Sequence, residues 1–283
     1  MRKIDFVKYQ GLGNDFVIID LIGRSSQKMD FNRLALAVCD RHRGVGADGI
    51  LVLTKSRLAD CTMDVFNADG SWAEKCGNGL RCVAAYLYQN HTRKKQLTIE
   101  TADGISDARI MKSGKRLLDV RVTIGTPEFN TKKIPMKSRH EYHINQPLKI
   151  AGVSLPVTAL AVGNPHCVLF VDNFNFDWQA MGNDIELNSI FPHRTNVEFV
   201  KIVNRKKIIL NDWERGAGAT GSSGTGASAA VVAGVVNGLL LRQVEVVFPS
   251  GSLHIDWSED DDSIYLTGPT EYVFGGIFDF DNK

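Results

Sequence analysis

The sequence predicts an α/β protein, α+β in its layout, with two pseudo-symmetric β-rich domains that each surround one buried helix. Three observations predict this fold class. Glycine clusters punctuate many short runs of β-branched residues, only two segments are strongly helical and apolar, and these two segments begin alike. The chain has 283 residues, 43% of them hydrophobic and 23% charged, which is typical of a globular protein long enough for two domains.

Short β-branched runs bounded by turn residues are expected to form the strands. In chain order they cover residues 16–19, 50–53, 97–100, 118–124, 157–162, 197–203, 207–213, 244–248 and 264–266. No proline-rich or serine-rich linker divides the chain, so the spacing alone puts the domain boundary near residues 120–130.

The two helical segments begin with the same pattern of small residues. Cys76-Gly77-Asn78-Gly79 leads into the apolar run 80–88, and Ser223-Gly224-Thr225-Gly226 leads into the run 227–236. A glycine turn precedes each start, at 67–70 and at 215–218, and Gly13-Asn14 is echoed by Gly163-Asn164. We interpret this as an internal duplication with one buried helix in each half; a chance likeness of two helix starts is the alternative.

The first turn of a helix suggests the chemistry of these two starts. It exposes unpaired N–H groups with a partial positive charge, and glycines there allow a ligand carboxylate to approach the backbone. The same position favours the thiolate of a cysteine, which makes it a better base. If the two domains face each other, one α-carbon can lie between residues 76 and 223, and acid–base groups on its opposite faces are what inversion of configuration requires.

A dinucleotide site is the competing interpretation of the second start. Gly224-Thr225-Gly226 with Ala229 fits a G-x-G-x-x-A pattern, and Glu245 follows about 20 residues later. The preceding expected strand ends at residue 213, about ten residues too early for a tight strand–turn–helix unit. Glu245 also begins the next strand instead of ending it, so this interpretation is the weaker one.

Charge and cysteine usage exclude several other classes of protein. Lys and Arg number 33 and Asp and Glu 32, without a basic block, which argues against a nucleic-acid partner. Residues 1–10 are too charged for a signal peptide, and the most apolar stretch, 227–241, is too interrupted for a membrane span. Five cysteines without a C-x-x-C pair argue against disulfides and a metal site and favour the cytoplasm.

Six ordered motifs resemble the diaminopimelate epimerase family. They are Gln10–Phe16 (QGLGNDF), Asp40–Gly49 (DRHRGVGADG), Asn67–Ser71 (NADGS), Cys76–Cys82 (CGNGLRC), Gly163–Cys167 (GNPHC) and Glu214–Gly218 (ERGAG). The resemblance extends from residue 4 to the segment 272–276 and therefore covers nearly the whole chain. It implies domains over 1–122 with a returning strand at 271–283, and over 123–270.

The resemblance also implies an activity and the residues that carry it out. The expected protein is a cofactor-independent, homodimeric amino-acid epimerase that interconverts L,L- and meso-diaminopimelate. Cys76 matches the first catalytic cysteine, Ser223 stands at the position of the second, and His166 and Glu214 match the residues that assist proton transfer. The expected substrate-binding residues are Asn14, Asn67, Gly77, Asn78, Asn164, Asn196, Glu214, Arg215, Gly224 and Thr225.

Three positions depart from the family pattern. Ser223 replaces a cysteine, Ala219 replaces an acidic residue, and Gly49 replaces a polar side chain found in some members. A serine hydroxyl is a poorer acid and base than a thiol, which leaves alternatives open: a lyase or dehydratase, a racemase for another amino acid, an inactive ligand-binding homologue, or a Cys→Ser variant of an epimerase. The intact set Asn67, Asn164, Asn196 and Arg215 favours diaminopimelate.

Each candidate residue also has a purely structural interpretation. Cys39, Cys61, Cys82 and Cys167 are most simply small buried residues. His166 alone could be a core histidine, Glu214 could form an ion pair with Arg215, and the four asparagines outside the helix starts could cap turns. His42 and His193 are expected to be structural or solvated.

Overall fold

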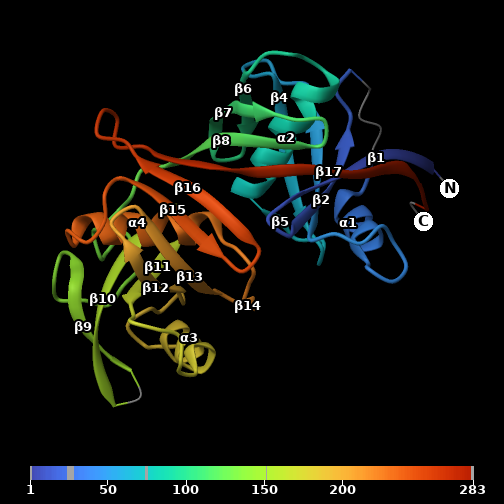
Figure 1. Ribbon diagram of the computed structural model, residues 1–283. Coiled ribbons are helices and arrows are strands. Elements are labelled where there is room, and N and C mark those ends of the chain that lie inside the picture. Colours follow the sequence, from blue (N-terminus) through green and yellow to red (C-terminus); the bar gives the residue numbers. More distant parts are fainter. Residues whose placement is uncertain (1, 24–28, 74–75, 151, 282–283) are drawn as a thin grey trace. The chain divides into compact units, whose positions relative to one another are not determined.

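The computed structural model describes residues 2–23, 29–73, 76–150 and 152–281. The chain forms two compact units: unit 1 comprises Met1–Thr123 with Thr267–Lys283, and unit 2 comprises Ile124–Leu266 (Figure 1). Each unit consists mainly of strands around one buried helix, which confirms the fold class expected from the sequence.

Unit 1 is a closed ring of strands. In order around the ring, these are β1 (Arg2–Gly11), β2 (Asn14–Asp20), β3 (Gly49–Thr54), β4 (Cys61–Asn67), β6 (Gln96–Thr101), β7 (Gly104–Ser113), β8 (Leu117–Gly125) and β17 (Ile264–Phe280). The short strand β5 (Trp72–Ala73) pairs with β4. The pairs β2–β3 and β4–β6 are parallel, so their connections must cross over; these contain α1 (Phe31–Cys39) and α2 (Gly77–Asn90).

Unit 2 repeats this order of elements. Its strands are β9 (His143–Ile150), β10 (Val153–Ala161), β11 (Pro165–Phe170), β12 (Asn196–Asn204), β13 (Lys207–Glu214), β14 (Gly218–Ala219), β15 (Gln243–Phe248) and β16 (Gly251–Trp257). The parallel pairs β11–β12 and β13–β15 again enclose helices, α3 (Trp178–Glu186) and α4 (Gly224–Val236). From β10 to β16 the sequence of pairings matches that from β1 to β7, so the expected pseudo-symmetry is confirmed.

The two expected helices are the buried ones. Residues 79–87 of α2 and 226–234 of α4 are buried, as an apolar surface on all sides of a helix requires. Both helices begin three residues before the apolar runs that predicted them, because the glycine pairs form the first turn. The two Gly-x-Gly segments are therefore the first turns of α2 and α4.

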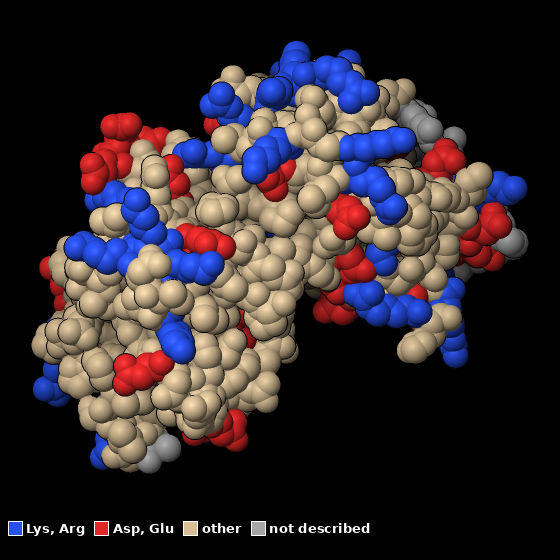
Figure 2. Space-filling view, viewed as in Figure 1, with Lys and Arg blue, Asp and Glu red and all other residues tan. Residues whose placement is uncertain are grey.

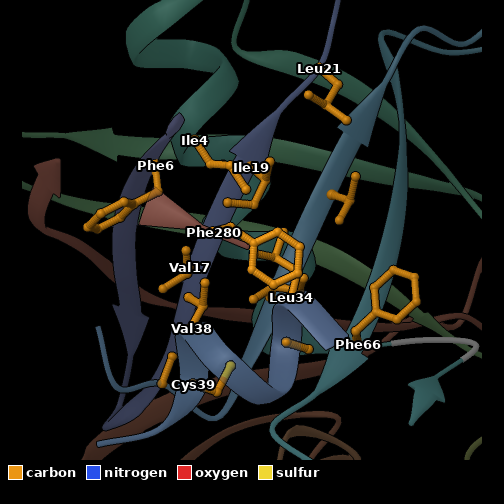
Figure 3. Close-up of a cluster of buried hydrophobic side chains, with 14 residues drawn as sticks. Ile4, Phe6, Val17, Ile19, Leu21, Leu34, Val38, Cys39, Phe66 and Phe280 are labelled. Carbon is orange, nitrogen blue, oxygen red and sulfur yellow. The ribbon is translucent and has the colours of Figure 1, made fainter. Parts of the chain in front are cut away.

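Helix α1 covers one side of the unit 1 strands. Figure 3 shows Leu34 and Val38 of α1 beside Val17 and Ile19 of β2, with Phe280 of β17 in the same cluster. The last strand of the chain therefore contributes to the core of the first unit. This core fixes the strand ends from which the candidate site is built.

The sequence-based assignment missed two short helices and several strands. Helices α1 and α3 begin at the capping residues Asp30 and Asp177, whose side chains accept hydrogen bonds from the backbone N–H groups of Arg33 and Ala180. The missed strands are β1, β4, β5, β7, β9, β11, β14 and β16.

None of the described helices is long and apolar enough to cross a membrane. Figure 2 shows basic and acidic side chains together on the visible face.

Candidate functional site

Cys76 is the residue that caps helix α2. Its Sγ accepts a hydrogen bond from the Gly79 N–H at 3.3 Å, and its carbonyl oxygen accepts one from the Leu80 N–H. A methyl group on Gly79 would lie 3.0 Å from Leu51 Cδ2 and 3.3 Å from Sγ. Glycine at position 79 is therefore what lets the sulfur fold back over the first turn, where the N–H groups favour a thiolate.

Ser223 caps helix α4 in the same way. Its Oγ accepts a hydrogen bond from the Gly226 N–H at 3.1 Å, and the residue is 6% exposed. A methyl group on Gly226 would lie 3.1 Å from both Ser223 Oγ and Glu198 Oε1. Serine is among the best capping residues, so position 223 keeps the geometry of the helix start while it changes the chemistry of the side chain.

Four of the five cysteines are buried, as expected from the sequence, and only Cys76 is partly exposed. Burial raises the pKa of Cys39, Cys61 and Cys82 to about 12 in each case, and it raises that of Cys167 well above its usual value. These four thiols are therefore poor nucleophiles at neutral pH.

We expect Cys76 to be the only cysteine that reacts rapidly with iodoacetamide in the folded protein. It combines exposure with a helix start, whereas the other four thiols lack both access and the thiolate form. Mass spectrometry after brief treatment would locate the modification, and the unfolded protein, in which all five cysteines should react, is the control. Early modification of Cys39 or Cys167 would contradict this assignment.

Two asparagines are joined at the start of α2. Asn78 Nδ2 donates to Asn14 Oδ1 at 2.9 Å, and Asn14 Nδ2 donates to Asp48 Oδ2 at 2.7 Å. Asp48 in turn accepts from the Asp15 N–H at 3.1 Å. This chain of hydrogen bonds ties the beginning of β2 to the first turn of the helix and fixes both amides beside Gly77.

A network of charged side chains continues this chain of hydrogen bonds. Arg41 bridges Asp15 and Asp48, with an Nη2–Oδ1 distance of 2.8 Å in each pair, and Lys8 contacts Asp15 at 2.6 Å. Burial works against ionisation of Asp15, but hydrogen bonds from Arg41 and Lys8 outweigh it and hold the pKa of this carboxyl below its usual value. The Asp40–Gly49 motif thus supplies structural ions rather than reacting groups.

Asn67 lies at the end of β4, opposite Gly49 of β3. Its side-chain Nδ2 donates to Ser71 Oγ at 2.9 Å, and the residue is exposed, so a ligand can reach it. A methyl group on Gly49 would lie 2.7 Å from the Phe66 carbonyl oxygen. The departure at position 49 therefore has a structural reason: the neighbouring strand leaves no room for a side chain.

Arg81 is a buried cation on α2 that sequence reasoning did not single out. It is fully buried, and none of its guanidinium nitrogens has a hydrogen-bond partner among the described residues. Burial lowers the pKa of this group, and the nearby thiols of Cys82 and Cys76 act in the opposite direction. A positive charge held in the same helix favours the thiolate of Cys76.

In unit 2, the structure brings Asn164 and His166 together. His166 lies in β11 with both ring nitrogens in contact with oxygens: Nε2 is 2.8 Å from Asn164 Oδ1 and Nδ1 is 2.6 Å from Glu198 Oε1. The histidine is completely buried and Glu198, on β12, is 1% exposed. Glu198 was missed from the sequence because it lies inside an apolar strand without a motif of its own.

The side chain of Asn196 makes hydrogen bonds to the backbone of two segments that carry other candidate residues. Its Nδ2 donates to the Pro165 carbonyl oxygen at 2.8 Å, and its Oδ1 accepts from the Arg215 N–H at 2.9 Å. Glu186 fixes the next turn by accepting from the Gly216 N–H at 3.0 Å. The exposed Arg215 side chain donates only to the His193 carbonyl oxygen, at 3.3 Å, among the described residues.

Glu214 shares one hydroxyl group with a second acid. Thr220 Oγ1 lies 2.6 Å from Glu214 Oε1 and also contacts Asp212 Oδ2. A hydroxyl has a single proton to donate, so two close carboxylates are most stable when one of them is protonated. Burial, together with the charges of Glu214 and Glu198, raises the pKa of Asp212 to about 7, although the Thr220 hydrogen bond opposes this. Ala219, at the position of the family's acidic residue, is exposed in β14.

The site residues thus form two groups, one in each unit. Unit 1 joins Cys76, Gly77, Asn78 and Asn14, with Asn67 at the same strand ends; unit 2 joins Asn164, His166, Asn196, Glu214 and Arg215, with Ser223, Gly224 and Thr225 at the start of α4. Each group combines a capped helix start with amides and a titratable group, which suits a carboxylate ligand and proton transfer. Among the described residues, no cluster of His, Cys, Asp and Glu could hold a metal ion.

Solved structures of proteins with different names share this fold. A phenazine biosynthesis protein of the PhzF family from Bacillus anthracis matches with a TM-score of 0.71 and 18% identity, over 99% of this chain and 100% of that one. A hydroxyproline epimerase from Agrobacterium vitis matches with a TM-score of 0.66 and 12% identity, over 98% and 91% of the two chains. At this level of identity, the likeness shows the fold alone.

Sequence comparison identifies the family. The chain is 43% identical over 277 residues to the diaminopimelate epimerase of Pelotomaculum thermopropionicum, which covers 97% of this chain and 99% of that protein. It is 44% identical over 278 residues to the enzyme of the same name from Carboxydothermus hydrogenoformans, with 97% and 99% covered. The family model described as diaminopimelate epimerase matches residues 6–130 and 158–273. The chain belongs to the diaminopimelate epimerase family.

Proposed function

We propose that this protein is an isomerase that interconverts L,L- and meso-diaminopimelate by proton transfer at the α-carbon. The observation that carries the proposal is the pair of equivalent helix starts, in which Cys76 and Ser223 occupy the same capping position. Removal of a proton from one face and its return to the other requires one acid–base group for each face. Membership of the family supplies the substrate.

Cys76 is the base of the proposed reaction. Its sulfur already accepts an N–H from the helix start, and Arg81 provides a buried positive charge. Ser223 occupies the position of the second acid–base group. His166 and Glu214 lie in the same unit, and Glu214 and Asp212 both contact the Thr220 hydroxyl. We propose that the backbone N–H groups of Gly77, Asn78, Gly224 and Thr225, in the first turns of the two helices, bind the carboxylate at the reacting end.

The distal amino-acid end needs a cation and hydrogen-bonding amides. Arg215 is exposed and has no carboxylate partner among the described residues. Asn67 and Asn164 offer amide groups, and Asn196 positions the Arg215 backbone. We propose that these residues bind the distal carboxylate and ammonium groups.

Arg215→Ala is expected to weaken diaminopimelate binding by about 2–5 kcal/mol, the loss typical of a charge-paired group. Calorimetry on a Cys76→Ser background would measure affinity without turnover. Arg205→Ala removes another exposed arginine of unit 2, from the turn between β12 and β13, and should leave binding unchanged. If Arg215→Ala binds as tightly as its parent, the substrate is a smaller amino acid.

Proton NMR in D₂O with each diaminopimelate isomer tests the proposed reaction directly. An epimerase replaces the α-hydrogen with deuterium and produces the other isomer. A lyase or dehydratase, which needs only the Cys76 base, expels a β-leaving group that diaminopimelate lacks, so such an enzyme would at most exchange the α-hydrogen without producing the other isomer. Binding without exchange would indicate a ligand-binding homologue, the alternative favoured by the Ser223 hydroxyl.

The family resemblance suggests the assembly of the protein, and its cysteine usage suggests the location. We propose a homodimer in the cytoplasm that needs no cofactor. Light scattering on the purified protein measures the first property, and activity after exhaustive dialysis against a chelator checks the third.

A further inference from the structure

His166 and Glu198 form a buried ionisable pair in unit 2. The Nδ1–Oε1 distance is 2.6 Å, and the side chains are 0% and 1% exposed. A buried ionisable pair is costly to desolvate unless its hydrogen bonds are made well. Both ring nitrogens of His166 are engaged, one by Glu198 and the other by Asn164.

The hydrogen bonds determine where the protons lie. Asn164 Oδ1 can only accept, so the facing Nε2 must carry a hydrogen. A second hydrogen then lies between Nδ1 and Oε1, either as an imidazolium beside a carboxylate or as a neutral imidazole beside a carboxylic acid. Burial raises the pKa of Glu198 and the histidine opposes this, in keeping with a proton shared inside a neutral pair.

The duplicated half of the chain shows that the helix start does not need this carboxylate. Leu51 stands at Gly79 as Glu198 stands at Gly226, and each contacts the same point of the first turn. The strand registers agree, because Ile18 is paired with Leu51 and Val168 with Glu198. An apolar side chain therefore packs satisfactorily in unit 1, and the acid in unit 2 serves His166.

We propose that Glu198 is a positioning residue that keeps His166 a donor at Nε2 and thereby fixes the orientation of the Asn164 amide. With Oδ1 occupied by His166, the Nδ2 group of Asn164 is the end left to donate, and it makes no hydrogen bond to a described residue. A donor at this point fits a carboxylate oxygen of the ligand. The proposal rests on the proposed function, in which Asn164 contacts the substrate.

NMR of the free protein tests the pair without any turnover. With ¹⁵N-labelled histidine at neutral pH, the wild type should show hydrogens at or shared by both His166 nitrogens, with a low-field resonance for the proton at Nδ1. Glu198→Gln, which keeps the shape of the side chain, should lose that resonance. Glu198→Leu copies Leu51 and should lose it as well, with thermal unfolding as the check that both variants are folded.

A second experiment measures kcat/KM of the wild type and of the Glu198 variants with L,L- and with meso-diaminopimelate. A fall of about 10²-fold is expected in Glu198→Leu, because His166 then has no partner at Nδ1, its Nε2 can accept as well as donate, and the Asn164 amide loses its fixed orientation. Glu198→Gln should retain more activity, because its amide can donate to Nδ1 and leave the hydrogen at Nε2. A folded Glu198→Leu protein with full activity, or a Glu198→Gln protein that retains the low-field resonance, would overturn the proposal, as would absence of that resonance from the wild type. If the wild type neither exchanges nor inverts diaminopimelate, the proposed function fails, while the NMR result still decides the role of Glu198.

Discussion

Ser223→Cys is expected to raise the rate of inversion by about two orders of magnitude. The hydroxyl of Ser223 occupies the capping position at 3.1 Å from the Gly226 nitrogen, so a thiol placed there receives the same N–H as Cys76 does in α2. Only the acidity of the side chain changes, and a matched acid–base group contributes about 10²–10⁴-fold to a proton transfer. The helix start therefore needs no rearrangement to accept the cysteine.

In the unmodified protein, the rates of proton removal from the two faces of the α-carbon should be unequal. Cys76 can remove the proton from one isomer, whereas Ser223 must act with a mismatched pKa on the other. Deuterium exchange from one isomer should consequently outpace inversion, and proton NMR in D₂O measures both rates in one sample. Equal exchange from both isomers would show that residue 223 is not the second acid–base group.

Ser228→Cys provides a matched control for this variant. Ser228 lies in the same helix, is fully buried, and donates to the Gly224 carbonyl oxygen at 2.8 Å. A thiol at this position gains no helix-start N–H and should bring no increase in inversion. If Ser223→Cys likewise gives no gain, the lyase or ligand-binding alternative replaces the epimerase.

The repeated helix starts were the most informative part of the sequence. Gly79 and Gly226 are required because the capping side chain folds back over them, and such a local requirement can be seen in the order of residues alone. The strands with β-branched runs, such as β3 and β12, were predicted for the same reason. By contrast, two of the three buried positions of β7, Ser106 and Ala108, carry little local preference for a strand.

The supporting residues of the site depend on contacts between distant segments. Glu198 is one acid among Val197, Phe199 and Val200, and nothing local indicates that its partner is His166, 32 positions earlier. Asp212 and Arg81 are similar cases, since their burial arises only when strands from distant parts of the chain pack around the buried helix of each unit. The family resemblance named the groups that contact the ligand, and the structure adds those that set their charge and orientation.

Cys76→Ser is expected to lower both deuterium exchange and inversion by about 10²–10⁴-fold, because it removes the base from the first face. The same chain shows that serine is compatible with this position of the fold: Ser223 caps α4 with the geometry by which Cys76 caps α2. The variant should therefore unfold at nearly the same temperature as the parent, and the loss can be assigned to chemistry. Proton NMR time courses in D₂O would measure the rates of exchange and of inversion.

Cys82→Ser is the matched control, at a position further along the same helix α2. Cys82 is completely buried, and burial raises the pKa of its thiol to about 12, so it cannot supply a base at neutral pH. Its replacement puts a hydroxyl into the core and should reduce stability but leave the exchange rate per folded molecule unchanged. If Cys76→Ser retained wild-type exchange while Cys82→Ser lost it, the reacting thiol would lie inside the helix packing and the helix-start mechanism would be wrong.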